Sequence, residues 1–305
     1  MQGGDLAREL RRRARSTWSR AELAQDPAFG AYSPRPGAFD GAAFRAAFEA
    51  CPERGFELAS RLANAADAPL RRQARRIAAR IILRHARAAG GTYGAGRLRR
   101  EPLGPDGDLD LDASLEALLL ARAGGSWALP DLVALTWERP RVAVCLVVDT
   151  SGSMSGGGLG HAALAAAAIA WRAGIDLSVV AVSDRALILK AQGSPRPIER
   201  VIDDLLSLQS YGWTNLALGL DAARAQLAHA AAGSRRIAIL LSDGQANRGG
   251  DPLRAARALD TLHVVTTAHA AEAGRTLASA GRGRAVRIER SGDIAPALDA
   301  LLTAL

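Results

Sequence analysis

The chain has 305 residues, and with 49% hydrophobic residues it can bury the cores of two domains of ordinary size. Its formal charge is +8, but residues 1–100 hold 20 Arg against 9 acidic residues, whereas residues 101–140 hold 2 Arg against 8. Because 38 of the 39 basic residues are Arg and Ala is abundant, we attribute the excess to a GC-rich genome, and charge alone does not predict a nucleic-acid partner.

Residues 1–18 are polar and Arg-rich, without the apolar segment of a secretory signal. The longest apolar stretch, residues 162–171, is far shorter than the roughly 18 residues that a membrane span needs. The two cysteines, Cys51 and Cys145, lie far apart, and the second falls in an apolar run typical of a buried strand. A disulfide framework is therefore not expected, and we expect a soluble, cytoplasmic protein in a reducing compartment.

Residues 1–89 have a helical pattern and contain no run typical of a strand. Apolar side chains recur at i, i+4, as in the pair Phe44 and Phe48. Prolines, which fix φ and disfavour helix in the preceding residue, interrupt the pattern at 33–37, 51–52 and 68–69. We predict a small all-helical domain of about four helices.

Five arginines share one broad face of the last of these helices. They are Arg71, Arg72, Arg75, Arg76 and Arg80. We interpret this face as a solvated surface, with docking onto an acidic surface as the alternative.

Residues 90–140 are predicted to form a linker, Gly-rich at its start and acidic at 106–112. The acidic run invites comparison with an EF-hand, but a template starting at Asp106 needs Gly and Glu where the sequence has Leu111 and Ala117. We therefore reject a calcium loop. The simpler interpretation is that Asp112 caps a short helix over residues 113–123, and a contact with the basic first domain is left open.

From residue 141 onward, short β-branched runs alternate with helical stretches rich in Ala and Leu. The candidate strands are 142–148, 177–182, 186–189, 236–241, 262–266 and 285–288, and the candidate helices are 159–172, 198–208, 216–231, 252–259, 271–280 and 294–302. This alternation predicts a doubly wound α/β sheet over residues 141–305, with helices on both faces. The segment 186–189 follows its predecessor too closely for a parallel crossover, so it should be an antiparallel edge strand.

Oxygen-rich loops follow two of these strands and precede one helix. Ligands of such sheets bind outside the carboxyl ends of the strands. The loops place five candidate metal ligands there: Asp149, Ser151, Ser153, Thr214 and Asp243. Two carboxylates and three hydroxyls, without thiol or imidazole, suit Mg²⁺, with Mn²⁺ or Ca²⁺ as substitutes, and disfavour Zn²⁺.

Plainer explanations exist for parts of this set. A turn after a strand would account for Asp149 and the serines that follow it, and Thr214 could be an ordinary helix N-cap. Neither explanation requires Asp243 at a further loop. We therefore prefer the metal site.

The Asp-x-Ser-x-Ser, Thr and Asp pattern of these five residues resembles the metal-ion-dependent adhesion site of von Willebrand factor A (VWA) domains. The resemblance covers about residues 141–305. It implies that Ser151, Ser153 and Thr214 contact the metal through their hydroxyls, while Asp149 and Asp243 act directly or through water. It also implies that the open coordination position takes a Glu or Asp carboxylate from a partner protein.

One position departs from the family pattern, because Trp213 stands where Gly is usual. An exposed Trp beside the metal would be a good partner anchor, and a buried, packing Trp is the equal alternative. His161 opens the helix after the metal loop, but we interpret it as an ordinary helix residue and leave it out of the site.

The order of a helical domain, an acidic linker and an A domain is similar to that of bacterial proteins that partner MoxR-type AAA+ ATPases. These include CoxE-like proteins and the D subunit of magnesium chelatase. The resemblance implies a non-enzymatic adaptor, while the ATPase drives remodelling or metal insertion in a client protein. The chain lacks a Gly-x-x-x-x-Gly-Lys-Ser/Thr loop, so we do not expect it to be the ATPase.

Parts of the sequence are also compatible with two other classes of function. Ro-type RNA-binding proteins also join a basic helical domain to an A domain, but residues 1–100 show no internal repeat of the kind those proteins use. A phosphatase of the haloacid dehalogenase type, with Asp149 as nucleophile, wants a second Asp where Ser151 stands. The adaptor is preferred, and RNA binding is the alternative.

Overall fold

The structure, a computed structural model, describes residues 18–88, 97–104, 107–126, 128–138, 141–151, 157–172, 174–208, 213–242, 248–266 and 271–303. The chain forms two compact units, one made of Met1–Gly91 with Val142–Leu305 and the other of Thr92–Arg141. We call them the first and the second unit. This division differs from the three parts predicted from the sequence, because the helical segment and the α/β segment share one unit.

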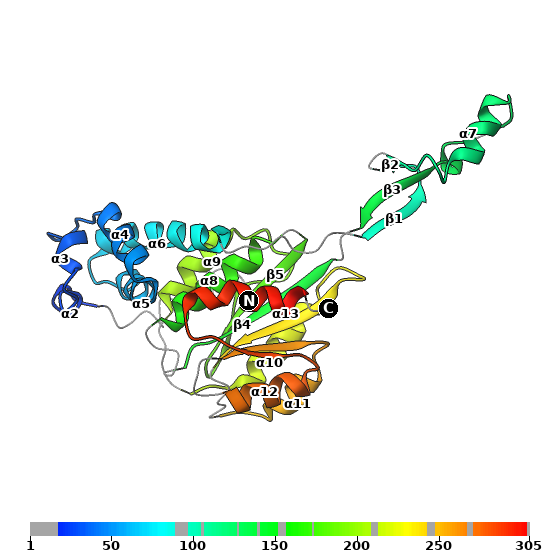
Figure 1. Cartoon of the computed structure of the whole chain (residues 1–305). Helices are drawn as coiled ribbons and strands as arrows, with labels where there is room; N and C mark the ends of the chain where they lie inside the picture. Colours follow the sequence, from blue (N-terminus) through cyan, green and yellow to red (C-terminus); the bar gives the residue numbers. More distant parts are fainter. Residues whose placement is uncertain are drawn as a thin grey trace. The chain divides into compact units, whose positions relative to one another are not determined.

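A six-stranded sheet in the order β6-β5-β4-β7-β8-β9 lies within the first unit (Figure 1). Its strands are β4 (Val142–Asp149), β5 (Ile175–Val182), β6 (Ala186–Lys190), β7 (Arg235–Leu241), β8 (Leu262–Thr266) and β9 (Ala285–Arg287). Neighbouring strands are parallel, except that β6 pairs with β5 in the antiparallel sense. The predicted α/β fold with one antiparallel edge strand is therefore confirmed.

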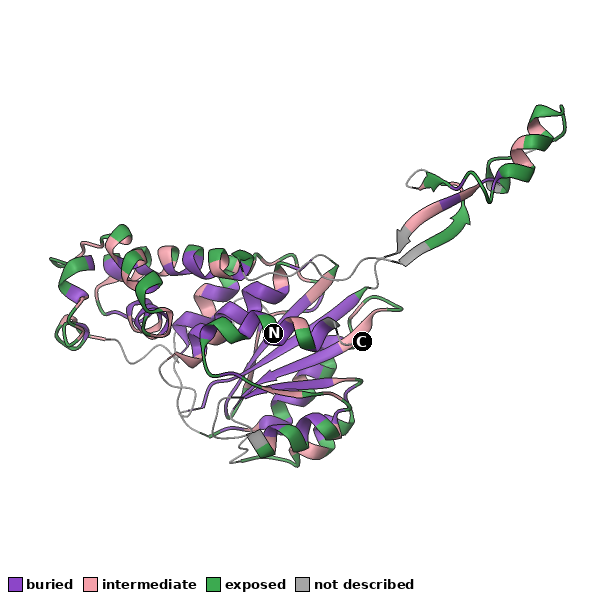
Figure 2. Cartoon of the chain, viewed as in Figure 1, coloured by how far each residue is buried: buried purple, intermediate pink, exposed green. Residues whose placement is uncertain are grey.

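Helices cover both faces of this sheet, because its central strands are apolar on both sides; every residue of β4 is buried (Figure 2). On one face, α10 (Leu216–Leu227), α11 (Pro252–Arg257) and α12 (Ala271–Ala280) close a single core of Leu, Val and Ala side chains. The other face carries α8 (Gly158–Ala170), α9 (Ile198–Ser207) and α13 (Ile294–Thr303). These helices lie within a few residues of the predicted ones.

The helical segment forms a further layer on α8 and α9. Its helices are α2 (Arg20–Leu23), α3 (Phe29–Tyr32), α4 (Gly41–Ala50), α5 (Pro52–Ala63) and α6 (Ala68–Ala88). Their core is a chain of buried aromatic rings, Phe29, Tyr32, Phe44, Phe48 and Phe56, in edge-to-face contacts. Both α5 and α6 pack against α8 and α9. The segment is helical as predicted, but it belongs to the first unit.

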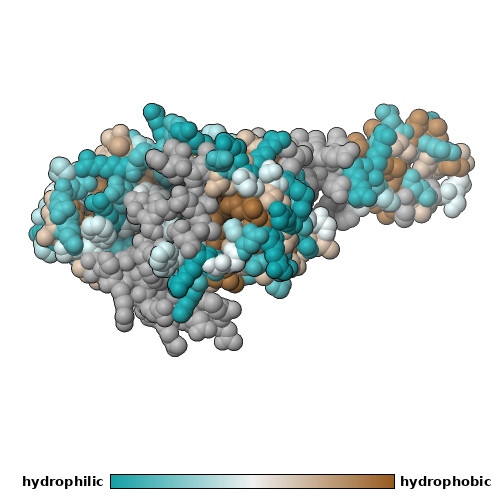
Figure 3. All heavy atoms as spheres, turned by 90° about the horizontal axis from the view of Figure 1, so that it is seen from below, coloured by the Kyte–Doolittle hydropathy of each residue, from teal (hydrophilic) through white to brown (hydrophobic). Residues whose placement is uncertain are grey.

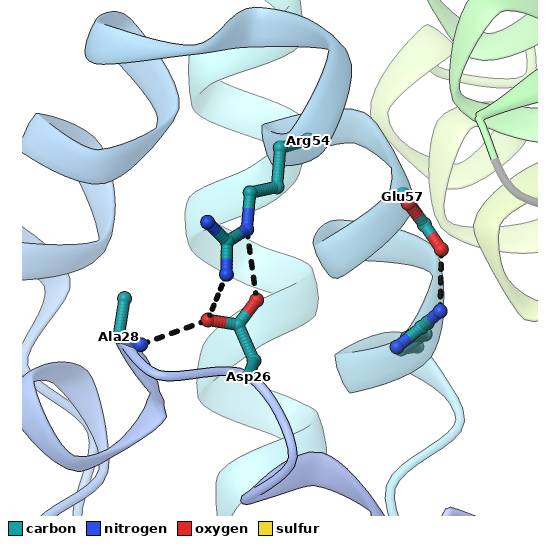
Figure 4. Close-up of polar contacts among 5 residues, drawn as sticks. Asp26, Ala28, Arg54 and Glu57 are labelled. Carbon is teal, nitrogen blue, oxygen red and sulfur yellow. Dashed lines mark hydrogen bonds and ion pairs between the residues drawn. The ribbon is translucent and has the colours of Figure 1, made fainter.

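Ion pairs fasten the loop between α2 and α3 to α5 (Figure 4). The guanidinium of Arg54 donates to both carboxylate oxygens of Asp26, at 3.2 and 2.8 Å, and the N–H of Ala28 donates to the same carboxylate at 2.9 Å. Glu57 pairs with Arg61 one turn further along α5. The Arg54 side chain is 53% exposed, so its pair with Asp26 orients the loop more than it stabilises it, and the Glu57–Arg61 pair lies within α5.

The arginine face of α6 is less solvated than predicted. Three of its five arginines are exposed, but Arg71 and Arg75 donate to backbone carbonyls at and just beyond the C-terminal end of α5. Arg75 Nε also lies 3.6 Å from Asp203 of α9. Two of the five charges thus hold α6 against its neighbours, which reduces the charge that the face offers to an acidic partner.

Asp204 of α9 lies in surroundings that favour its neutral form. Burial raises the pKa of Asp204 to about 6 from an ordinary 3.8, and its ion pair with Arg196 offsets this only in part. A carboxyl whose pKa is raised by folding adds most to stability at low pH, and its contribution is lost as the pH rises through the folded value. His263 of β8 acts in the opposite sense over a similar range, because burial lowers its pKa to about 4.

We expect the variant Asp204→Asn to separate these two effects. The free energy of unfolding of the wild type minus that of the variant should increase by roughly 2 kcal/mol as the pH falls from about 7 to about 4.5, because only the wild type gains from protonating residue 204. Denaturant unfolding at several pH values measures this difference. Glu199→Gln, an exposed carboxyl on the same helix, is the control, and a difference independent of pH would contradict the raised pKa.

The second unit contains a small sheet where a linker with only a short helix was predicted. Strands β1 (Arg97–Pro102), β2 (Asp108–Leu109) and β3 (Val133–Glu138) pair antiparallel in the order β1-β3-β2, and α7 (Leu115–Arg122) lies between β2 and β3 in the chain. The sequence pattern did not predict these strands, because β1 is charged and pairs with a segment that is distant in the sequence.

The helix of the second unit also starts differently from the prediction. Asp110, and not Asp112, accepts the N–H of Ala113 in the turn before α7, and Asp110 also pairs with Arg100 of β1. Asp112 is exposed. The acid that holds the turn is therefore the one that the small sheet buries.

In the part of the chain that the structure describes, no helix has both the length and the apolar character needed to cross a membrane. Cys51 is exposed, Cys145 is buried in β4, and both are free thiols.

Candidate metal centre

The carboxyl ends of β4, β5 and β7 meet at one edge of the sheet, where the sequence predicted the metal site. β4 ends at Asp149, which lies beside Val182 of β5, while the preceding Val148 lies beside Leu241 of β7. The side chain of Asp149 is fully buried. A buried carboxylate is costly unless polar groups surround it, so its neighbours decide what it can do.

Hydrogen-bond donors from three loops converge on Asp149. The N–H of Ser151 donates to Oδ1 at 2.8 Å, Thr214 Oγ1 donates to the same oxygen at 3.4 Å, and Ser242 Oγ donates to Oδ2 at 2.7 Å. The first contact is one that a plain turn would also form. The other two come from loops far away in the sequence, and they bring hydroxyl groups to this carboxylate as the site requires.

Thr214 can face Asp149 because its neighbour caps the following helix. The side chain of Asn215 accepts the N–H of Leu218 at 3.1 Å and is the N-cap of α10. The backbone N–H of Asn215 donates to the carbonyl of Ser183 after β5, and the N–H of Arg248 donates to the carbonyl of Thr214. The alternative in which Thr214 is itself the N-cap is therefore excluded.

Gly249, in the loop after β7, lies against the same corner. Its φ is +96°, and a Cβ there would lie 2.1 Å from Asn215 Oδ1. Both the backbone angle and the close approach require glycine. Gly249 can therefore lie directly beside Asn215.

Three of the five predicted ligands are thus brought together: Asp149, Ser151 and Thr214. All three are buried. Ser153 and Asp243 lie outside the described residues. Sequence reasoning gave no role to Ser242, which holds Asp149 in place. Its position directly after a buried strand, next to a predicted ligand, is the signal that could have identified it.

Trp213 precedes Thr214, and 57% of its surface is exposed. Of the two alternatives drawn from the sequence, a packing Trp and an exposed Trp, the structure has the exposed one. It therefore offers a large apolar surface directly beside the candidate centre.

The donor set fits a hard divalent cation. Within the described ranges, no three His, Cys, Asp or Glu side chains gather as a metal cluster. The groups gathered here are one carboxylate and two hydroxyls that donate to it. Such oxygens are the ligands of Mg²⁺, Mn²⁺ and Ca²⁺. A buried carboxylate surrounded by hydroxyl and amide donors also supplies the negative charge that a cation would neutralise.

A polar cluster ties the start of α8 to the helical segment. Glu53 of α5 accepts the N–H and the hydroxyl of Ser291, at 2.5 and 2.7 Å, and its other oxygen lies 2.9 Å from His161 Nε2. Burial alone would raise the pKa of Glu53, but these hydrogen bonds outweigh it and lower the pKa. His161 also packs edge-on against Phe56. It therefore serves the contact between α8 and α5.

Part of the chain is similar to proteins of a known family. The von Willebrand factor type A domain family matches residues 143–279. No curated protein matches the sequence. Similar solved structures include an aerotolerance-related membrane protein from Bacteroides fragilis, with 16% identity, 54% of this chain and 100% of that chain covered, and a TM-score of 0.45.

Two further structures are similar to a comparable extent. BatB from Bacteroides thetaiotaomicron has 15% identity, with 53% of this chain and 98% of that chain covered and a TM-score of 0.44. A von Willebrand factor type A protein from Catenulispora acidiphila has 19% identity, with 56% and 44% covered and a TM-score of 0.45. The match to the von Willebrand factor type A family covers residues 143–279, which include β5 to β8 and nearly all of β4, and the carboxyl edge of this sheet holds the candidate metal centre.

Proposed function

We propose that this chain is a non-enzymatic, Mg²⁺-dependent protein-binding adaptor. The observation that carries the proposal is the buried carboxylate of Asp149, on which hydroxyl groups of separate loops converge at the carboxyl edge of a VWA sheet. Ser151 and Thr214, with Ser153 and Asp243 from the sequence pattern, would hold the ion. Once bound, the ion would offer an open position to a Glu or Asp carboxylate of a partner.

Burial of Asp149 also supports a role without catalysis. A carboxylate that attacks a substrate must reach the reacting atom, whereas Asp149 has no exposed surface. Ser242 and Thr214 fix its two oxygens, so it is suited to hold an ion in place. The RNA-binding alternative draws less support, because two of the five arginines on the α6 face are engaged within the first unit.

The proposed partner is a MoxR-type AAA+ ATPase that acts on a client protein. The order of segments in the chain supports this partner. A helical segment followed by an A domain resembles the arrangement in known partners of such ATPases. The helical segment packs on α8, the helix that follows the metal loop. A partner that engages the metal centre would therefore meet a single unit that includes the helices.

A pull-down with the purified MoxR-type ATPase of the same genome tests the proposal. We expect recovery with Mg²⁺, and a loss of at least about tenfold in EDTA or in Asp149→Ala, which corresponds to about 1.4 kcal/mol of binding free energy. Asp184→Asn, an exposed carboxylate just after β5, is the matched control and should bind normally. Equal recovery with and without metal would refute the proposal.

Trp213 should contribute binding energy without contributing to metal binding. We expect Trp213→Ala to raise the Kd for the same partner by roughly 10- to 30-fold, as the loss of an exposed aromatic anchor does, while the affinity for Mn²⁺ stays unchanged. Isothermal titration calorimetry measures both. Trp171→Ala removes another exposed Trp, one that stacks on Arg87, and should leave partner binding intact; an equal effect of both variants would argue against a specific anchor.

A further inference from the structure

The second unit exposes an unusual amount of apolar surface. Nine large hydrophobic side chains are exposed among the described residues, and six of them lie in this unit: Leu109, Leu111, Leu115, Leu119, Leu120 and Leu129. Figure 3 shows hydrophobic residues gathered at the α7 end of this unit, beside hydrophilic ones. Exposed apolar patches of this kind on a soluble protein mark interaction sites.

These leucines do not serve the core of their own unit. Among its described side chains, only Leu132 and Ala134 are buried and apolar. No residue of α7 is buried. The side chains of Leu115 and Leu119, one helical turn apart, line a shallow hollow together with Glu116, Leu120 and Ala123. The outer face of α7 is thus an apolar stripe open to a partner.

The charges around the N-terminal half of this stripe are acidic. Residues 101–131 hold seven acidic residues and a single basic one, Arg122. Asp112 and Glu116 are exposed at the N-terminal half of α7, and within the described residues neither side chain forms an ion pair or a hydrogen bond. A complementary surface must therefore combine apolar side chains with Lys or Arg.

We propose that this surface, formed by Leu115, Leu119, Leu120, Asp112 and Glu116, binds an amphipathic helix of another protein whose apolar stripe is flanked by Lys or Arg. A helix is the occupant that fits, because an exposed helical stripe with one-turn spacing packs well against a second helix. This interaction goes beyond the metal-dependent function and needs no metal.

A labelled synthetic helix of about 14 residues, made of Leu and Lys, is the probe, titrated with the full chain and followed by fluorescence anisotropy. Because the whole chain carries +8, attraction of a cationic peptide must come from a local acidic surface. We expect binding with a Kd of tens of micromolar that EDTA does not change. The double variant Leu115→Ser with Leu119→Ser should weaken it at least tenfold.

Charge and position have their own controls. Asp112→Asn with Glu116→Gln should weaken binding by roughly threefold or more and reduce its dependence on salt. Leu218→Ser removes an exposed leucine of α10, outside this unit, and should leave binding unchanged. A helix of the same length made of Leu and Glu is the control for the probe. Any binding of this acidic helix should be the same for the wild type and for the leucine variants.

Three results would overturn the proposal. Probe binding that the leucine variants do not weaken would show that another surface attracts the peptide. A dimer of the full chain that Leu119→Ser dissociates would show that a second copy covers the stripe. Binding to phosphatidylcholine vesicles that the same variant abolishes would identify a lipid surface instead. None of these results depends on whether the metal centre binds its ion.

Discussion

Asp149→Ala should abolish the stabilisation of this chain by divalent cations. A ligand that binds only the folded state at about ten times its Kd adds roughly 1.4 kcal/mol to the free energy of unfolding. Asp149 is the buried carboxylate on which the hydroxyl groups converge, so its loss removes the charge that attracts the ion. Thermal unfolding with and without Mg²⁺ or Mn²⁺ measures the effect, and the melting temperature of the variant should not respond to metal.

Two variants make this result specific to the site. Thr214→Ala removes one neutral oxygen donor and should weaken Mn²⁺ binding less than Asp149→Ala does, because it leaves the charge in place. Asp184→Asn, at the same sheet edge but exposed, should keep the full response. A wild-type chain that Mg²⁺, Mn²⁺ and Ca²⁺ all fail to stabilise would count against a metal centre at this edge.

Gly160→Leu should be the most destabilising single change in the contact between the helical segment and the α/β part. Even a Cβ at Gly160 of α8 would lie 2.7 Å from the Cβ of Phe56 on α5, and 2.9 Å from its ring. A leucine must therefore push α5 away from α8. We expect the free energy of unfolding to fall by about 3 kcal/mol, at the upper end of what overpacking costs.

The control for this change is Gly30→Ala in α3, where an added Cβ has no neighbour within 4 Å. It should change stability by less than about 1 kcal/mol. Denaturant unfolding followed by circular dichroism measures both variants. If the helical segment were an independent domain, Gly160→Leu would leave its unfolding unchanged, so one cooperative transition shifted as a whole is the expected result.

The position of the candidate site could be predicted from the sequence, because the order of strands and loops is local. Asp149 ends one apolar strand segment and Asp243 lies two residues after another, and parallel strands bring their carboxyl ends to one edge whatever the details of packing. Thr214 was among the predicted ligands, but a residue before a helix can cap it or face inward, and the sequence left both possibilities open. Here Asn215 takes the cap, and only the tertiary contact shows that Thr214 is left for Asp149.

The sequence by itself determined the α/β sheet, its antiparallel edge strand and the helical nature of residues 18–88, because periodicity and chain connectivity are local properties. Tertiary structure decided how these parts combine. The apolar character of Phe56 is evident from the sequence. Its packing against Gly160 of α8 is not, because the two residues are about a hundred positions apart. The pairing of β1 with β3 also joins segments that are not adjacent in the sequence, and the charged residues of β1 carry no strand pattern. Such contacts depend on shape complementarity between distant surfaces, which a sequence pattern does not contain.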